Sequence, residues 1–125
     1  MIIHSSPLVH AVIGCAIEVH RAMGPGLLES AYGRCMRYEL TQRGIPFRHE
    51  VPLSLPYKDV VIDCVYRADL IIEDTLLVEL KSVDRLISIH DAQILTYLKL
   101  ADLHHGFLIN FNVHRLVDGL KSIVR

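Results

Sequence analysis

The sequence is poor in several features that would identify a protein class at once. It has no tryptophan and only three cysteines, Cys15, Cys35 and Cys64, which form no C-x-x-C pair. An odd number of widely spaced cysteines argues against a disulfide framework and against a zinc knuckle. We therefore expect buried thiols in a reducing cytoplasm. The formal net charge is only −1, so the overall charge does not mark the chain as a nucleic-acid binder.

Long hydrophobic runs are also missing. The most apolar N-terminal run, residues 8–19, is about half as long as a membrane span and contains Glu18. It lacks the basic leader and the small-residue cleavage site of a signal peptide. We expect a cytoplasmic protein with no membrane partner. The chain has 125 residues, of which 51% are hydrophobic and 22% charged, so we expect one globular domain over residues 1–125.

Two helices are expected in the N-terminal third. Ser6 is a suitable N-cap before a proline, and apolar residues then recur at helical spacing up to the Gly-Pro-Gly at residues 24–26. A second helix is expected over residues 27–43. Its apolar stripe lies on one side, and Arg34 and Arg37 face away from that stripe.

The pattern changes to that of strands from Pro46. Three prolines in the extended segment that follows predict an edge strand, because proline cannot donate to the ladder. Residues 60–72 and 76–81 are rich in β-branched residues and leucine, and they predict a hairpin with its turn at residues 73–75.

The remaining elements complete an α/β fold. Ser88 and Asp91 resemble a capping box at the start of a third helix, and residues 106–111 and 120–124 are expected to be strands. The predicted order ααβββαββ describes a mixed central β-sheet flanked by α-helices.

The hairpin contains three charged residues in an otherwise apolar stretch. If residue 72 pairs with 76, Asp69 lies directly opposite Glu79 and shares a face with Arg67 and Ile71, while Glu79 shares a face with Lys81. Opposed carboxylates repel each other. A divalent cation would offset this repulsion, since Mg²⁺ is typically bound by one or two carboxylates, and Lys81 could orient an attacking water. The alternative is a solvated polar face on which Lys81 pairs with one of the acids.

These residues carry a resemblance to a known superfamily. The order Asp69, Glu79, Lys81 fits the D…(D/E)-x-K signature of the PD-(D/E)XK nuclease superfamily, which implies a restriction-endonuclease-like core. The segment GPGLLESAY contains the motif Gly26-x-x-Glu29-x-x-Tyr32, which resembles that of the GxxExxY family, a small bacterial branch of the superfamily. Further blocks, YRADLIIED, LLVELKS, HDAQILTYLK and LINF, extend the resemblance over residues 9–124.

The resemblance implies a role for each residue that matches the motifs. Asp69 and Glu79 would ligate Mg²⁺ or Mn²⁺ together with the backbone carbonyl of Leu80. Lys81 would act on the nucleophilic water. Glu29 would approach the metal through a water molecule and is counted with the catalytic residues.

Three further residues are expected to contact nucleic acid or to support the metal ligands. Gln93 and Tyr97 match the Q-x-x-x-Y motif of RecB-like nucleases and share one helix face, and Tyr32 completes the GxxExxY motif. Each has a plain alternative. The helix dipole favours an acidic residue at position 29, near a helix start, whatever its role. Both tyrosines could be core residues. Gln93 could be an ordinary exposed residue. The pair at residues 104–105, two histidines, lacks the further ligands of a zinc site.

The sequence thus predicts a Mg²⁺-dependent nuclease that acts on nucleic acid, with DNA preferred over RNA, and a possible homodimer. The alternative from another class is a catalytically silent domain that binds nucleic acid or a protein partner. A hydrolase of another phosphoester would use the same residues. Cleavage assays with and without metal separate these alternatives.

Overall fold

A five-stranded sheet forms the middle of the computed structural model, which describes residues 6–125 and only the backbone of Cys64 and Val65. Its strands are β1 (Phe47–Tyr57), β2 (Val60–Ile72), β3 (Leu76–Lys81), β4 (His105–Asn110) and β5 (Leu120–Val124). They lie side by side in chain order. Strands β3 and β4 are parallel, and the other neighbours are antiparallel.

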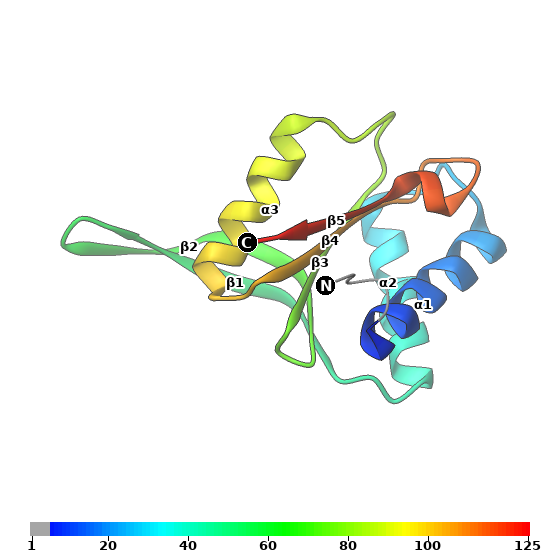
Figure 1. Cartoon of the computed structure of the whole chain (residues 1–125), viewed down its shortest axis with the longest axis horizontal. Helices are drawn as coiled ribbons and strands as arrows, with labels where there is room; N and C mark the ends of the chain where they lie inside the picture. The colour runs from blue at the N-terminus through cyan, green and yellow to red at the C-terminus, as the bar shows by residue number, and fades with distance from the viewer. Residues whose placement is uncertain (1–5) are drawn as a thin grey trace.

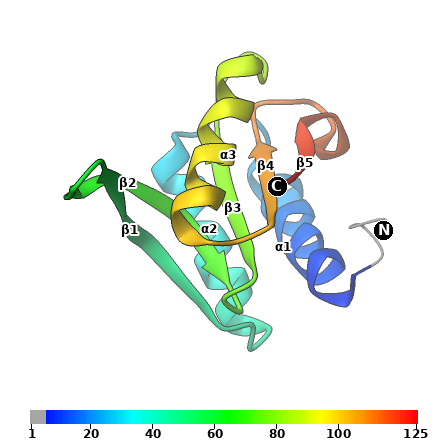
Figure 2. The same cartoon turned by 60° about the vertical axis from the view of Figure 1, so that its left-hand side comes forward.

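Helices cover both faces of this sheet. Helices α1 (Pro7–Met23) and α2 (Glu29–Gln42) pack on one face, and α3 (Ser88–Ala101) packs on the other (Figure 1). Figure 2 shows α3 in front of the sheet and α2 behind it. A short 3-10 helix, η2 (Leu116–Gly119), leads into β5. The predicted mixed sheet with flanking helices is confirmed. No helix among residues 6–125 is both long and apolar enough to cross a membrane.

The helix ends agree with the sequence in one case and differ in another. Ser6 caps α1 as expected, since its hydroxyl accepts a hydrogen bond from the backbone N–H of Val9. The capping box predicted for α3 is wrong. Ser88 is already helical, and the N–H of Ile87 donates to Nδ1 of His90 at 3.0 Å. Asp91 instead accepts a hydrogen bond from Lys121, so it ties α3 to β5.

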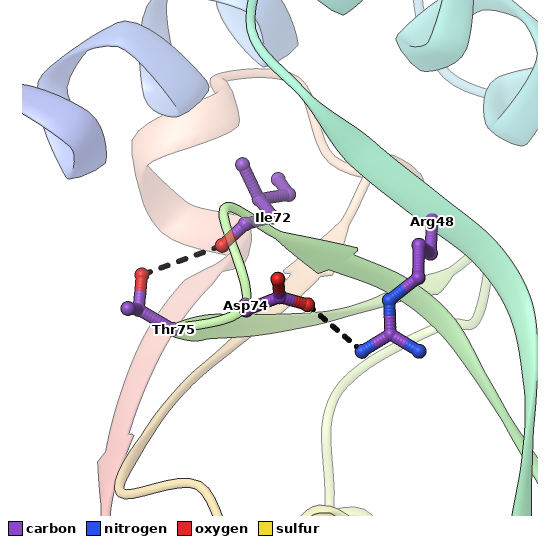
Figure 3. A network of polar contacts seen from close by, with 4 residues as sticks. All are labelled: Arg48, Ile72, Asp74 and Thr75. Carbon is purple, nitrogen blue, oxygen red and sulfur yellow. Dashed lines mark hydrogen bonds and ion pairs between the residues drawn. The ribbon is translucent and has the colours of Figure 1, made fainter.

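The turn between β2 and β3 occupies the three predicted residues. Glu73 and Asp74 adopt positive φ angles of 50° and 55°. The hydroxyl of Thr75 donates to the carbonyl of Ile72, and the carboxylate of Asp74 lies 3.0 Å from the guanidinium of Arg48 on β1 (Figure 3). These contacts hold the turn against the edge strand, and the turn sets the register of the hairpin.

Strand β3 runs between two cores and alternates as predicted. Val78 and Leu80 belong to the core beneath α1 and α2, whereas Leu77 belongs to the core beneath α3. Glu79 and Lys81 therefore share the face of Leu77. Because both faces of β3 are covered, charged groups on it lose water, and this loss governs their chemistry.

Strand β2 departs from simple alternation next to Asp69. Ala68 and Ile71, three positions apart, both pack in the core beneath α3, although a regular strand would place them on opposite faces. Glu50, which faces Asp69 across the β1–β2 pairing, has a φ of 49° and interrupts the pleat. The expectation that Arg67, Asp69 and Ile71 share one face is therefore wrong. Asp69 lies at a kink.

The cysteines agree only in part with the expected buried thiols. Cys15 is fully buried, and burial raises the pKa of its thiol. Cys35 is only half-buried: it packs against the core beneath α1 and α2 and lines a groove between these two helices. The side chain of Cys64 lies outside the described part of the chain.

Tyr32 is part of the core. Its ring is fully buried and stacks on Phe111, with centroids 4.3 Å apart. Its hydroxyl donates to the carbonyl of Gly24 and accepts a hydrogen bond from the N–H of Leu27 at 3.2 Å. Tyr32 therefore holds the loop between α1 and α2 in place.

We predict that Tyr32→Phe lowers the free energy of unfolding by about 1–2 kcal/mol, because it leaves two backbone groups without their partner. Urea denaturation followed by circular dichroism measures the change. Tyr38→Phe is the control, since Tyr38 lies on the same helix and is 62% exposed. Equal stability of the two variants would contradict the role assigned to the Tyr32 hydroxyl.

Candidate active site

Asp69 and Glu79 meet where the pairing of β2 with β3 ends. The register Leu70 with Val78, carried one step further, sets Asp69 opposite Glu79. Beyond this point the two strands are joined by hydrogen bonds between backbone and side chain instead of backbone–backbone hydrogen bonds. The N–H of Asp69 donates to Oε1 of Glu79, and the N–H of Leu80 donates to Oδ2 of Asp69, both at 2.8 Å. Each carboxyl group is thus fixed by the backbone of the opposite strand.

The charge of Asp69 disfavours ionisation of Glu79. Glu79 is only 4% exposed, and burial, followed by the charge of Asp69, raises its pKa to about 8. Burial also raises the pKa of Asp69, while the Leu80 N–H and the charge of Lys81 oppose that rise. Two carboxyl groups this close, one buried and one half-buried, cannot both ionise without cost. A cation between them would remove that cost.

Lys81 lies on the same face of β3 as Glu79 and points to α3. Its ammonium group donates to Oε1 of Gln93 at 3.2 Å. Its charge lowers the pKa of both Asp69 and Glu79. Among the ion pairs within residues 6–125, none joins Lys81 to either acid. The alternative was a solvated polar face on which Lys81 pairs with one of the acids. The structure does not contain this pair.

Glu29 approaches the same site from α2, of which it is the first residue. Its carboxylate accepts a hydrogen bond from the N–H of Ser82 at 3.3 Å, and the hydroxyl of Ser82 donates to the carbonyl of Leu27 at 2.6 Å. The charge of Glu29 contributes to the raised pKa of Asp69. The start of α2 is thus tied to the end of β3.

Tyr97 lies one helical turn beyond Gln93 on α3. It is buried, and its ring centroid is 5.6 Å from that of Tyr66 on β2. Burial, and then the charges of Glu79 and Asp69, raise the pKa of its hydroxyl. Tyr97 is therefore close enough for the charges of both carboxylates to affect its pKa.

The structure gathers most of the residues that the sequence singled out. Those brought together are Glu29, Asp69, Glu79, Leu80, Lys81, Gln93 and Tyr97. Tyr32 is the exception. It is buried against Phe111, where it cannot contact a ligand at this site.

Other residues at the site were not identified as such from the sequence. Asn110 is buried at the end of β4, and its amide bonds both the N–H and the carbonyl of Val83, which fixes the segment after Lys81. The sequence signal that could have identified Asn110 is a polar residue at the end of an apolar strand. Arg34 and Arg37 line a cavity that Asp69 also lines, although the sequence showed only that they avoid the apolar stripe.

A family model described as the PD-(D/E)XK nuclease superfamily matches residues 6–123. The chain belongs to the PD-(D/E)XK nuclease superfamily. Comparisons with curated proteins and with solved structures find no match. Membership confirms the resemblance seen in the sequence at the level of the superfamily and implies nucleic-acid binding.

PD-(D/E)XK nucleases generally use divalent metals, and the donor set of this member suits such an ion. The buried carboxylate of Glu79 and the half-buried carboxylate of Asp69 would supply the acidic ligands. No group of three or more His, Cys, Asp or Glu in the described part of the chain could hold a metal ion. The protein would therefore offer two carboxylates, with water and phosphate oxygens for the rest. Such oxygen donors suit a hard divalent cation.

Proposed function

We propose that this chain is a Mg²⁺- or Mn²⁺-dependent nuclease that hydrolyses phosphodiester bonds in DNA in preference to RNA. The observation that carries the proposal is the close pair of a buried Glu79 and a half-buried Asp69, which no cationic side chain in residues 6–125 neutralises through an ion pair. Lys81 lies beside them and is held by Gln93. Two acids that can hold a divalent metal, with a lysine beside them, suit metal-assisted hydrolysis of a phosphodiester.

The carboxylates would hold the metal. Asp69 and Glu79 are held by backbone N–H groups, so they need little rearrangement on binding, and the Leu80 carbonyl is the further ligand we propose. Bound there, Mg²⁺ would supply a Lewis acid for the scissile phosphate and lower the pKa of a bound water.

Lys81 would orient the attacking water. Its three N–H donors can bond to Gln93 and to a water at once, and its charge would stabilise the negative charge that develops on the phosphate. Gln93 acts through Lys81 and is a positioning residue. Glu29 would hold a further water beside Asp69, and Tyr97 would shield the site on the side of α3.

Finer assignments follow the same resemblance. Gly26, Glu29 and Tyr32 support membership of the GxxExxY branch, and Gln93 and Tyr97 support a RecB-like Q-x-x-x-Y motif. We further propose a bacterial, cytoplasmic protein whose single domain spans residues 1–125. Apolar side chains exposed at the β1–β2 hairpin support a homodimer: Tyr57, Val60, Val61 and Ile62.

The direct test is a cleavage assay. Purified protein is incubated with end-labelled single-stranded and duplex DNA and with RNA, in Mg²⁺, in Mn²⁺ or in EDTA. We expect products only with metal, and faster cleavage of DNA. Survival of every substrate would refute the nuclease, and faster cleavage of RNA would refute the preference for DNA.

A catalytically silent domain that binds nucleic acid or a protein partner is the second candidate. The observation in its favour is the pKa of Glu79 of about 8, because a protonated carboxyl group does not ligate metal. A nuclease should therefore cleave faster at pH 9 than at pH 6.5, as the ligand loses its proton. Labelled DNA that binds the protein but survives in Mg²⁺ at both pH values would favour the silent domain.

A further inference from the structure

A cavity of about 480 Å³ lies between α2 and the kinked part of strands β1 and β2. Its lining includes Glu29, Arg34, Arg37, His49, Asp69 and Leu80. Ligand sites typically have volumes of about 300–1,000 Å³, so it has room for a nucleotide unit. Because Asp69 forms part of its wall, the cavity joins the proposed catalytic site on the side of α2, across the sheet from Gln93 and α3.

Two arginines of this cavity have no partner within the described residues. Arg34 and Arg37 are one turn apart on α2, and neither forms an ion pair or a hydrogen bond through its side chain there. This holds although Glu29 and Glu50 line the same cavity. By contrast, Arg48 is paired with Asp74 (Figure 3). The donors of both cavity arginines are thus available to an anionic ligand.

The guanidinium of Arg37 is folded over Gly33. Its Nη1 atom lies 3.4 Å from the position that a Cβ atom on Gly33 would take, and the side chain of Leu80 lies 3.9 Å from that position. Arg37 therefore reaches toward the strand that carries Glu79 and Lys81. Glycine is unfavourable inside a helix, so a buried glycine at this position suits a close approach of the guanidinium to the helix surface.

We propose that Arg34 and Arg37 bind a phosphate of the substrate strand that neighbours the scissile phosphate. The inference rests on the proposed nuclease function and adds the path of the strand, which crosses α2 and β1 before it reaches Asp69. A guanidinium fork matches the oxygens of a phosphate. The two positive charges also offset the repulsion that Glu29 and Glu50 would exert on a nucleic acid.

Binding measurements test this subsite apart from cleavage. In a Lys81→Ala background, fluorescence anisotropy measures the affinity for a 5′-fluorescein-labelled single-stranded DNA oligonucleotide over a range of salt concentrations. We expect Arg34→Gln and Arg37→Gln each to weaken binding about tenfold and to reduce the slope of log K against log salt, and the double variant to reduce it by about 0.7, the value for one phosphate of a single strand. In the protein with Lys81, KM should rise about tenfold and kcat should change little.

Arg48→Gln is the matched control, because Arg48 is an exposed arginine that does not line this cavity. It should leave affinity and slope unchanged. Arg37→Lys should keep the slope but lose part of the affinity, since it keeps the charge without the fork. The proposal is overturned if the parent does not bind the oligonucleotide, or if neither glutamine variant changes the slope. If the parent binds but no form of the protein cleaves, only the proposed catalytic function fails.

Discussion

Replacing Lys81 with alanine should lower the rate of metal-dependent cleavage about 10²–10³-fold while the protein stays folded. The ammonium group is aimed by Gln93 toward the side of β3 that carries Glu79. Its removal takes away the group that orients the water and stabilises the developing charge, and losses of this size follow when one such group is deleted. Lys81 is only half-buried, so truncation leaves the core intact.

The comparison that isolates this effect is Lys99→Ala. Lys99 is an exposed lysine near the end of α3, and its loss should leave kcat within about twofold of the parent. Initial rates on labelled DNA in Mg²⁺ give kcat, and thermal denaturation checks the fold. Asp69→Asn should lose activity as severely as Lys81→Ala. Cleavage by the Lys81 variant at the parental rate would exclude the assigned mechanism.

The hairpin is where the sequence predicted the structure best. Runs of β-branched residues and leucine gave β2 and β3 the bounds that the structure shows, with the turn at the predicted residues. Asp74 is a residue type that tolerates a positive φ angle, and the turn length fixes the register. With the register known, the opposition of Asp69 and Glu79 follows by counting.

The kink at Asp69 could not be derived in this way. It depends on the φ of 49° at Glu50, a residue type that gives no local signal for a left-handed conformation. The kink places Asp69 in the wall of the cavity beneath α2. The sequence identified Arg34 and Arg37 only as polar positions of a helix. Helical periodicity does not show which part of the sheet faces those positions.

Tyr32 shows a second limit. A tyrosine in an apolar helical stripe suits either a core or a site, and the motif Gly26-x-x-Glu29-x-x-Tyr32 does not distinguish the two. The deciding contact is the stacked ring of Phe111, which comes from a distant part of the sequence. The motif therefore combines a residue that faces the site, Glu29, with one that supports the loop before it.

Replacing Glu79 with glutamine should stabilise the protein, and more so as the pH rises. The pKa of Glu79 is about 8 in the folded chain, mainly because of burial, against an ordinary value of 4.5. The folded state therefore holds a proton that the unfolded state has lost between these two pH values. Since stability falls with pH wherever the folded state binds more protons, the parent should lose stability from about pH 4.5 to about pH 8.

Glutamine keeps the shape of the neutral acid. Its carbonyl can accept the bond from the N–H of Asp69 that Glu79 accepts now, and it cannot ionise. We expect Glu79→Gln and the parent to have similar free energies of unfolding at pH 4.5, and the variant to be more stable by at least ~1.4 kcal/mol at pH 8.5, the equivalent of one pKa unit.

Urea denaturation in EDTA at the two pH values measures both free energies without interference from metal. Glu50→Gln is the control, since Glu50 is an exposed carboxylate beside the same cavity. The variant should also fail to cleave, because an amide is a poor substitute for a charged metal ligand. A stability gap that does not widen with pH would show that Glu79 is ionised in the fold and would remove the electrostatic reason for a cation at this site.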